Sequence, residues 1–487
     1  MEFSVVFFHE LEPISLRLDA EYYRPYFLEI EKTIKRKTWD YLINLRNSIK
    51  SFGAYSLCNQ VNYRKSGIPF LRCKDIKKGQ IDFSDVLFID EETNKLLWKS
   101  EIFPNTVLFT MSGTVGNSAI ATEDLNYPIN SNQDIAKIIT NEKICPYTLS
   151  IFLQSKYGKG QTERLPIGSV QQHIFLWQLD RLIIPLFNDS FEKLLERVYR
   201  LSSKCQRSAI DEYNQAQNIL LSDLGLINWK PQNQLSFIKC FSDTQKAKRF
   251  DAEYFQLKYD EIITAVKSCT NGWDKLDNLV FLKKCFEVGS EEYQDNGTPF
   301  IRVSNLSPFE ITEEKYISEI LYSRLTPPEV YEIPFIESKN HQPKKGEILI
   351  SKDATPGIAY YLNEDPKKMI PSGGILRLKL KDKRVYPEYL NLLLNSIIVQ
   401  EQINRDVGGS VILHWRTDQV RDTVIPILRD KTQKMICSKV QKSIIFRNNS
   451  KKLLDWAIVA VEIAIEKDET IAKDWLEDQI RPIVGDP

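Results

Sequence analysis

Residue types and spacings that support catalysis are almost absent from this sequence. Glu337-Ser338-Lys339 contains the Glu-x-Lys pattern of some nucleases, but three-residue matches arise often by chance. Gly113-Thr114-Val115-Gly116 lacks the Gly-Lys-Ser or Gly-Lys-Thr ending of a phosphate-binding loop. No Gly-x-Ser-x-Gly elbow is present, and neither is an Asn-Pro-Pro-Tyr or Asp-Pro-Pro-Tyr pocket for a base that receives a methyl group. We therefore expect a chain that catalyses nothing itself and holds no cofactor.

Metal-binding and redox chemistry also lack the residues they need. The four histidines (9, 173, 341 and 414) show no metal-ligand spacing, so we expect no metal. The eight cysteines are scattered without a Cys-x-x-Cys pair, which favours free thiols in a reducing compartment. No signal peptide is recognisable, and the apolar run 457–465 contains Glu462 and is too short to cross a bilayer. These features predict a cytoplasmic protein that does not associate with membranes.

Net charge excludes a general nucleic-acid coat but leaves sequence-specific DNA binding open. The 487 residues include 65 basic and 65 acidic side chains, which gives a net charge of zero. A neutral chain can still gather lysine and arginine on one face, and this length allows two to four domains. Because catalysis is not indicated, we next examined the elements that would position side chains for binding.

The sequence is one module written twice. Gly67-Ile68-Pro69-Phe70-Leu71-Arg72 returns as Gly297-Thr298-Pro299-Phe300-Ile301-Arg302, at an offset of 297 − 67 = 230. The opening Asp-Ala-Glu-Tyr-[Tyr/Phe] at 19–23 returns at 251–255, and Gly168-Ser169-Val170 returns as Gly409-Ser410-Val411 at an offset of 241. Collinear matches with a slowly drifting offset indicate a duplication with loop insertions.

Each copy combines β-rich sequence with a long helix. The first copy is predicted to contain a helix over 19–35 and strands over 69–73, 86–89, 106–111 and 135–139, followed by a helix from Pro146 and a strand over 182–185. Apolar residues then recur every three or four positions along about 35 residues after Asp189, and a similar seam follows the second copy, interrupted at 447–450. The segment 228–248 is predicted to be a linker.

These patterns predict an α+β fold with two β-rich recognition domains, related by a pseudo-two-fold axis and separated by a pair of long antiparallel helices. The expected domain boundaries are 1–188 for the first recognition domain with its N-terminal helix, 189–225 for the first spacer helix, 226–428 for the linker and second recognition domain, 429–467 for the second spacer helix, and 468–487 for the tail.

The duplicated motifs, each module followed by a long helix, resemble the specificity (S) subunit of Type I restriction-modification systems over about residues 17–467. The resemblance implies that each target recognition domain reads one half of an asymmetric, bipartite double-stranded DNA target. It also implies that the helices set the spacing and dock two methyltransferase subunits, which carry S-adenosylmethionine, and that translocase-endonuclease subunits join for phage defence. A Type IIB-like or other defence methyltransferase complex and a stand-alone DNA-binding or anti-restriction protein remain alternatives.

Positions that match between the copies are expected to be framework or phosphate contacts, whereas unmatched loop positions are free to read bases. The matched Arg72 and Arg302 have two possible roles, a framework ion pair and a phosphate contact. The matched His173 and His414 have two possible roles as well, a capping role and a phosphate contact. Gln171 and Gln172 are unmatched, and glutamine can bind adenine with two hydrogen bonds, although a solvated loop is the alternative. The candidate DNA contacts are Arg72, Lys74, Thr114, Asn117, Asn132, Gln133, Gln171, Gln172 and His173 in the first copy, and Arg302, Ser304, Asn305, Lys352, Asp353, Thr355, Ser410, His414 and Arg416 in the second.

The helix seams supply a second group of candidates. Two long helices with apolar stripes most simply bury those stripes against each other. Leu201, Tyr213, Val440 and Val461 are the positions at which we expect the helices to bind partner subunits.

Overall fold

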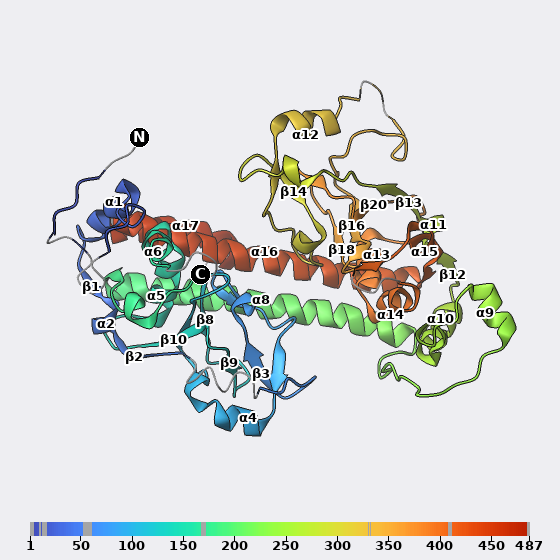
Figure 1. The fold of residues 1–487 in the computed structure, drawn as a ribbon, viewed down its shortest axis with the longest axis horizontal. Coiled ribbons are helices and arrows are strands. Elements are labelled where there is room, and N and C mark those ends of the chain that lie inside the picture. Colours follow the sequence, from blue (N-terminus) through green and yellow to red (C-terminus); the bar gives the residue numbers. More distant parts are fainter. Residues whose placement is uncertain are drawn as a thin grey trace. The chain divides into compact units, whose positions relative to one another are not determined.

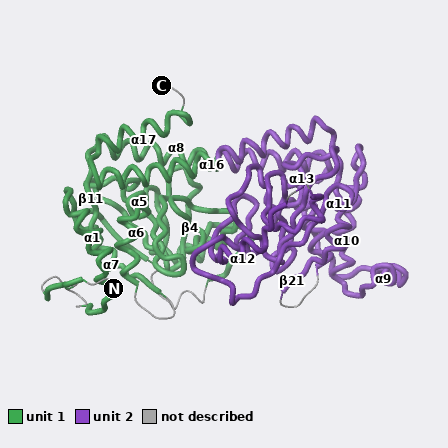
Figure 2. The backbone as a smooth tube through the Cα atoms, turned by 90° about the horizontal axis from the view of Figure 1, so that it is seen from above, with its two compact units in different colours: residues 1–207, 447–487 green, residues 208–446 purple. Residues whose placement is uncertain are grey.

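The structure, a computed structural model, describes residues 4–8, 11, 17–51, 61–166, 172–329, 331, 333–407 and 412–484. The chain divides into two compact units, one formed by residues 1–207 with 447–487 and the other by residues 208–446 (Figure 2). Both divisions fall inside a long helix, so each unit contains part of each long helix.

The first unit contains a four-stranded antiparallel sheet, β2-β10-β7-β8, and a three-stranded sheet, β6-β3-β9, in which β3 and β9 are parallel (Figure 1). A short pair, β1-β11, joins the beginning of the unit to its end, and β4 pairs with β5. The elements before the long helix are α1 (Pro25–Ile34), β1 (Trp39–Tyr41), α2 (Leu42–Leu45), β2 (Arg46–Lys50), β3 (Ile68–Leu71), β4 (Ile76–Lys77), β5 (Gln80–Ile81), β6 (Leu87–Ile89), α4 (Glu91–Leu96), β7 (Thr106–Thr110), β8 (Ser118–Ala121), β9 (Asn130–Ser131), β10 (Ile135–Thr140), α5 (Pro146–Gln154), α6 (Lys156–Glu163), α7 (Leu176–Leu179) and β11 (Ile183–Pro185).

The second unit repeats the four-stranded sheet, the three-stranded sheet and the terminal strand pair of the first unit. Its sheets are β13-β20-β16-β18, β15-β14-β19 and β12-β22, with β17-β21 as an additional pair. The elements are α9 (Phe241–Ala247), α10 (Leu257–Lys267), β12 (Trp273–Lys275), α11 (Leu276–Leu279), β13 (Val280–Lys284), β14 (Thr298–Ile301), β15 (Tyr316–Ile317), α12 (Glu319–Leu325), β16 (Glu347–Ser351), β17 (Asp353–Ala354), β18 (Ala359–Tyr361), β19 (Ile370–Pro371), β20 (Ile375–Leu380), α13 (Pro387–Leu394), α14 (Ile397–Asp406), β21 (Leu413–His414), α15 (Thr417–Asp422) and β22 (Val424–Pro426). The predicted duplication is therefore confirmed within each unit.

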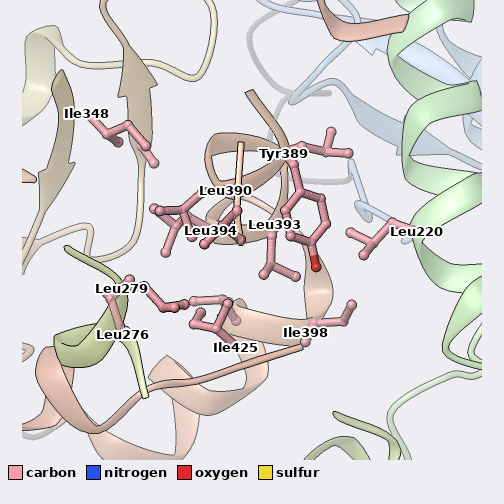
Figure 3. Packing of buried hydrophobic residues seen from close by; sticks show 14 of the residues in the cluster. Leu220, Leu276, Leu279, Ile348, Tyr389, Leu390, Leu393, Leu394, Ile398 and Ile425 are labelled. Carbon is pink, nitrogen blue, oxygen red and sulfur yellow. The ribbon is translucent and has the colours of Figure 1, made fainter. Parts of the chain in front are cut away.

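The core of the second unit forms where its helices cover the larger sheet. Figure 3 shows Tyr389 and Leu393 of α13 beside Leu220 of the long helix, with Ile348 of β16 in the same cluster. All four side chains are at most 1% exposed. Burying such side chains is the dominant favourable contribution to folding of the unit.

Two long helices, α8 (Asp189–Asp223) and α16 (Asp430–Glu466), confirm the predicted pair. In the first unit, the hydroxyl groups of Ser202 on α8 and Ser450 on α16 lie 2.9 Å apart. In the second unit, Ser443 on α16 donates to the carbonyl oxygen of Ala209 on α8 at 2.7 Å. The residue number on α16 decreases from 450 to 443 as that of its partner on α8 increases from 202 to 209, so the helices are antiparallel. The polar segment 447–450 does not interrupt α16, because buried Ser450 has this partner.

One expectation about local structure was wrong, and two segments without predicted elements contain helices. The first helix begins at Pro25 rather than at residue 19, because a residue before proline avoids helical angles; Arg24 is extended. The segment 228–248 is not wholly irregular, since it contains α9. The tail forms a helix, α17 (Glu469–Val484), with Leu476 buried on one side.

The duplicated Arg-x-Asp-Ala-Glu-Tyr opening closes each unit on itself. Arg17 binds both carboxylate oxygens of Asp19 at 2.8 and 2.7 Å, and its Nη1 donates to the carbonyl oxygens of Arg164 and the following residue at 3.3 Å. Arg249 repeats these contacts with Asp251 and with the carbonyl oxygens at the end of α14. The arginine thus satisfies carbonyls that the end of α6 or α14 leaves without helical partners.

Candidate nucleic-acid interface

The strand that carries the repeated Gly-x-Pro-Phe-x-Arg motif needs its glycine for two reasons. Gly67 has φ +136° and Gly297 has φ +135°, a conformation that side chains rarely adopt. A Cβ at Gly67 would lie 2.5 Å from the carbonyl oxygen of Ile89, and one at Gly297 would lie 2.4 Å from that of Ile317. The glycine therefore lets β3 and β14 approach their neighbouring strands and sets the position of the arginine at the strand end.

Arg72 closes the turn that follows β3. Its Nε donates to Oδ2 of buried Asp75 at 3.1 Å, and its Nη2 donates to Oδ1 at 3.2 Å. Lys74 forms an ion pair with Asp85, which also lies 3.6 Å from Arg72 Nη2. The hydrogen bond from Lys74 lowers the pKa of Asp85. Both cations of this turn therefore have carboxylate partners, as the framework alternative requires.

Arg302 occupies the same place in the second unit. Its Nη2 donates to Glu314 at 2.6 Å, and its backbone N–H donates to Oδ1 of Asn305 at 3.1 Å. Asn305 is buried and donates to Thr312 at 3.4 Å, whereas neighbouring Ser304 is exposed. The matched arginines are thus each tied to an acidic side chain within their own unit.

Two predicted residues of the first unit hold one loop on another. Thr114 donates to the carbonyl oxygen of Cys73 at 3.2 Å, and Asn117 donates to that of Ile76 at 3.1 Å. The loop after β7 therefore lies on the turn that contains Arg72. Thr114 and Asn117 thus each donate one hydrogen bond within their own unit.

The remaining described candidates of the first unit lie around this loop. Asn132 donates its backbone N–H to the last residue of β3 at 2.9 Å, and its side-chain oxygen is buried without a hydrogen-bond partner. Gln133 follows it and is partly buried. His173 forms a β-bridge with Ser112, and Gln172 beside it is exposed. Gln172 thus has the accessibility that base reading requires.

In the second unit, four predicted residues line a pocket of about 320 Å³: Lys352, Asp353, His414 and Arg416. Pairing of β17 with β21 sets Asp353 opposite His414, and the carboxylate Oδ1 lies 2.8 Å from the ring Nδ1. Lys352 forms an ion pair with the other oxygen of Asp353. Arg416 pairs with Asp418 at 2.9 Å, and both side chains are 67% exposed.

Thr355 completes the predicted group next to this pocket. Its backbone N–H donates to the carbonyl oxygen of Asp353 at 2.7 Å, and its own carbonyl accepts from Ser351 at 2.6 Å. Ala354 between them has φ +59°. Thr355 therefore shapes the turn that presents Asp353.

Sequence reasoning missed the other residues of the pocket, which are Lys284, Cys285, Gly373, Trp415 and Thr417. Burial raises the pKa of the Cys285 thiol to about 12, so it stays neutral. Trp415 is 1% exposed, and its indole N–H is buried without an acceptor. The two adjacent lysines at 283 and 284 and the position of Trp415 directly after a candidate histidine were the available signals.

Two candidates, Gln171 and Ser410, lie outside the described residues. Their contacts with DNA stay predictions.

The candidate partner-binding residues on the helices are mostly covered by their own unit. Val440 is 4% exposed and Val461 is 0% exposed, so neither can contact another chain directly. The ring of Tyr213 packs edge-on against Phe309 at 4.9 Å, and Leu201 is partly buried. The side chains of Val440 and Val461 therefore stabilise the helix pair, and partner binding by the helices that carry them stays a prediction.

The two units differ in how they bury a basic side chain in the larger sheet. Arg377 on β20 binds both oxygens of Glu347 at 2.7 and 2.8 Å, and the pair is almost completely buried. Lys137 holds the equivalent position on β10 but donates to Ser131 at 3.0 Å, because Thr106 replaces the carboxylate. Burial lowers the pKa of Lys137 to about 7.

Two further properties bear on the class of protein. Among the residues that the structure describes, no group of histidine, cysteine, aspartate or glutamate side chains is arranged to hold a metal ion. Within the same ranges, every helix is too short or too polar to cross a lipid bilayer.

Comparison with known proteins agrees with the motifs. Residues 271–453 match the family model described as Type I restriction modification DNA specificity domain. The Type I restriction enzyme EcoBI specificity subunit of Escherichia coli is 33% identical over 92 residues, which are 19% of this chain and 19% of that protein. The matched part therefore spans about a fifth of that relative.

Two solved structures overlap most of the chain at low similarity. The S subunit of a Type I restriction-modification system from M. genitalium has a TM-score of 0.38 at 13% identity and covers 88% of this chain and 95% of its own. The HsdS subunit from Thermoanaerobacter tengcongensis has a TM-score of 0.28 at 13% identity, with 88% and 97% covered. Neither overlap is close enough to establish function. The family match is the informative finding, because it falls on a module whose motifs and strand order occur twice: residues 271–453 of this chain are similar to the Type I restriction modification DNA specificity domain.

Proposed function

We propose that this chain is the DNA sequence-specificity subunit of a Type I restriction-modification complex. The observation that carries the proposal is the presence of two copies of one module in a single chain, the second of which matches the specificity-domain family. Two modules with a shared framework and different loop residues suit a target of two unlike halves. Each unit reads one half through the loops at the ends of β3 and β7, or β14 and β16.

In this proposal the chain is not catalytic. Two methyltransferase subunits bind to it and carry S-adenosylmethionine, and translocase-endonuclease subunits join them for cleavage of unmodified DNA. The paucity of catalytic motifs and the extensive internal pairing of the acidic side chains near the loops support this division of labour. The complex works in the cytoplasm.

Mapping of methylated adenines by long-read sequencing tests the proposal. Deletion of the gene should erase methylation at one asymmetric, bipartite motif, and restoring the gene should restore it. Gln172→Ala should relax one base position in one half-site, because Gln172 is exposed and unmatched between the copies. Gln232→Ala, which changes an exposed glutamine outside the candidate DNA contacts, is the matched control and should leave both half-sites unchanged. Unaltered methylation after deletion would refute the proposed function.

A further inference from the structure

We propose that the pocket of the second unit binds a phosphate group of the DNA backbone and that the first unit has no equivalent site. The inference rests on the proposed function, which it refines by assigning one contact to the backbone rather than to a base. It also reverses an expectation, since unmatched residues were expected to read bases.

The charge in the pocket is the first argument. Lys284, Lys352, His414 and Arg416 all line it, and Asp353 is the acidic lining residue. Both oxygens of Asp353 are already engaged, one by His414 at 2.8 Å and the other by Lys352. The ion pair with Lys352 therefore offsets its charge, and the carboxylate holds both Lys352 and the imidazole of His414 in place.

Lys284 and Arg416 remain available to a ligand. Lys284 is exposed and forms no ion pair with any residue in the described part of the chain. The pair between Arg416 and Asp418 is 67% exposed on both sides, and such pairs contribute little and exchange readily with solvent. Arginine and lysine together favour a phosphate, which accepts hydrogen bonds but donates none.

The uncharged lining residues suit the same ligand. Cys285 stays protonated, so it adds no negative charge. Trp415 also lines the pocket, and its indole N–H is buried without an acceptor. A base edge presents both donors and acceptors, whereas a surplus of donors matches an acceptor-only group.

The first unit has neutral residues at the corresponding positions. Offsets of 241 relate Ser112 to Asp353, Phe175 to Arg416 and Met111 to Lys352, and the bridge between Ser112 and His173 repeats the pairing of Asp353 with His414. Lys50 faces Lys137 as Lys283 faces Arg377, so Ser51 stands where the second unit has Lys284. The first unit therefore keeps the histidine but lacks the lysines, the arginine and the aspartate of the pocket.

The test measures how DNA binding by the intact complex depends on salt. A duplex that carries the target read from the methylation map is titrated at several salt concentrations against wild type, Arg416→Gln and Lys284→Gln. Each lost phosphate contact should reduce the steepness of log affinity against log salt concentration by about 0.9. It should also weaken binding to all DNA sequences alike. Phe175→Gln and Ser51→Gln, at the matched positions of the first unit, should leave the slope unchanged.

A second measurement locates the contact. Replacing single phosphates of the second half-site by uncharged methylphosphonates should weaken wild-type binding at one position, and Arg416→Gln should show no further loss there. If Arg416→Gln keeps the wild-type slope and instead changes base preference, the pocket reads bases and the inference is wrong. An equal change of slope for Phe175→Gln would also overturn it. A wild-type complex that binds no specific DNA would overturn the proposed function as well, so the two failures are distinguishable.

Discussion

Lys137 makes the stability of the first unit depend on pH above neutrality. Its ammonium group is buried with one hydroxyl partner, and burial lowers its pKa from 10.5 to about 7. The unfolded chain therefore binds more protons than the folded chain between these two values, so stability rises with pH across that window. Linkage with these pKa values gives a gain of about 2 kcal/mol between pH 7 and pH 9.

Lys137→Met removes the titrating group and keeps most of its volume. The gain between pH 7 and pH 9 should then disappear from the transition of the first unit in urea unfolding followed by tryptophan fluorescence. Thr106→Glu supplies the carboxylate that Glu347 provides in the second unit, and it should raise the pKa of Lys137 and flatten the same curve. Lys50→Met, which changes an exposed lysine on the neighbouring strand, is the control. Parallel pH curves for wild type and Lys137→Met would refute the reasoning.

Three further predictions concern the framework. Gly67→Ala should destabilise the first unit by about 2–4 kcal/mol, because the backbone has a positive φ and the added Cβ clashes with a neighbouring carbonyl oxygen. Gly297→Ala should have the same effect on the second unit. Calorimetry would show which unfolding transition moves to a lower temperature. Arg377→Met leaves the Glu347 carboxylate buried without its partner and should lower the free energy of unfolding by about 3–5 kcal/mol. The double variant Arg377→Met with Glu347→Leu should recover most of that loss. Urea unfolding measures both variants, and a double variant as unstable as the single one would contradict the account. Ser450→Ala removes hydrogen bonds between the long helices and should cost about 1 kcal/mol in the same assay; an unchanged midpoint would show that they add no net stability.

The repeated fold was predictable because the matching residues serve the framework. Gly67 and Gly297 match because only glycine tolerates the backbone angle and the approach of a neighbouring carbonyl. Arg17 and Arg249 match because each closes the end of a helix. Such roles depend on backbone geometry, which both units share, so duplication in the sequence reports them directly.

The pocket and the ion pairs were less predictable because they join residues that are distant in the sequence. Lys284 and Trp415 are separated in the sequence by most of the second unit. The pairing of β13 with β20 is needed to bring them together. The carboxylate partners of Arg72 and Arg302 follow from turn geometry that the motif does not encode. Helix α16 continues through 447–450 because Ser450 has a buried partner, which periodicity cannot reveal.

The short ladders that join β1 to β11 and β12 to β22 bring the two ends of each recognition segment side by side. The segment between Tyr41 and Ile183 therefore begins and ends at neighbouring positions in space, and so does the segment between Lys275 and Val424. A segment with such adjacent ends can be grafted as a cassette if a donor sequence reproduces the three-residue ladder and the packing on the long helix, such as that of Tyr389 beside Leu220. Under the proposed function, exchange of such cassettes would give the chain new DNA targets while the long helices stay the same.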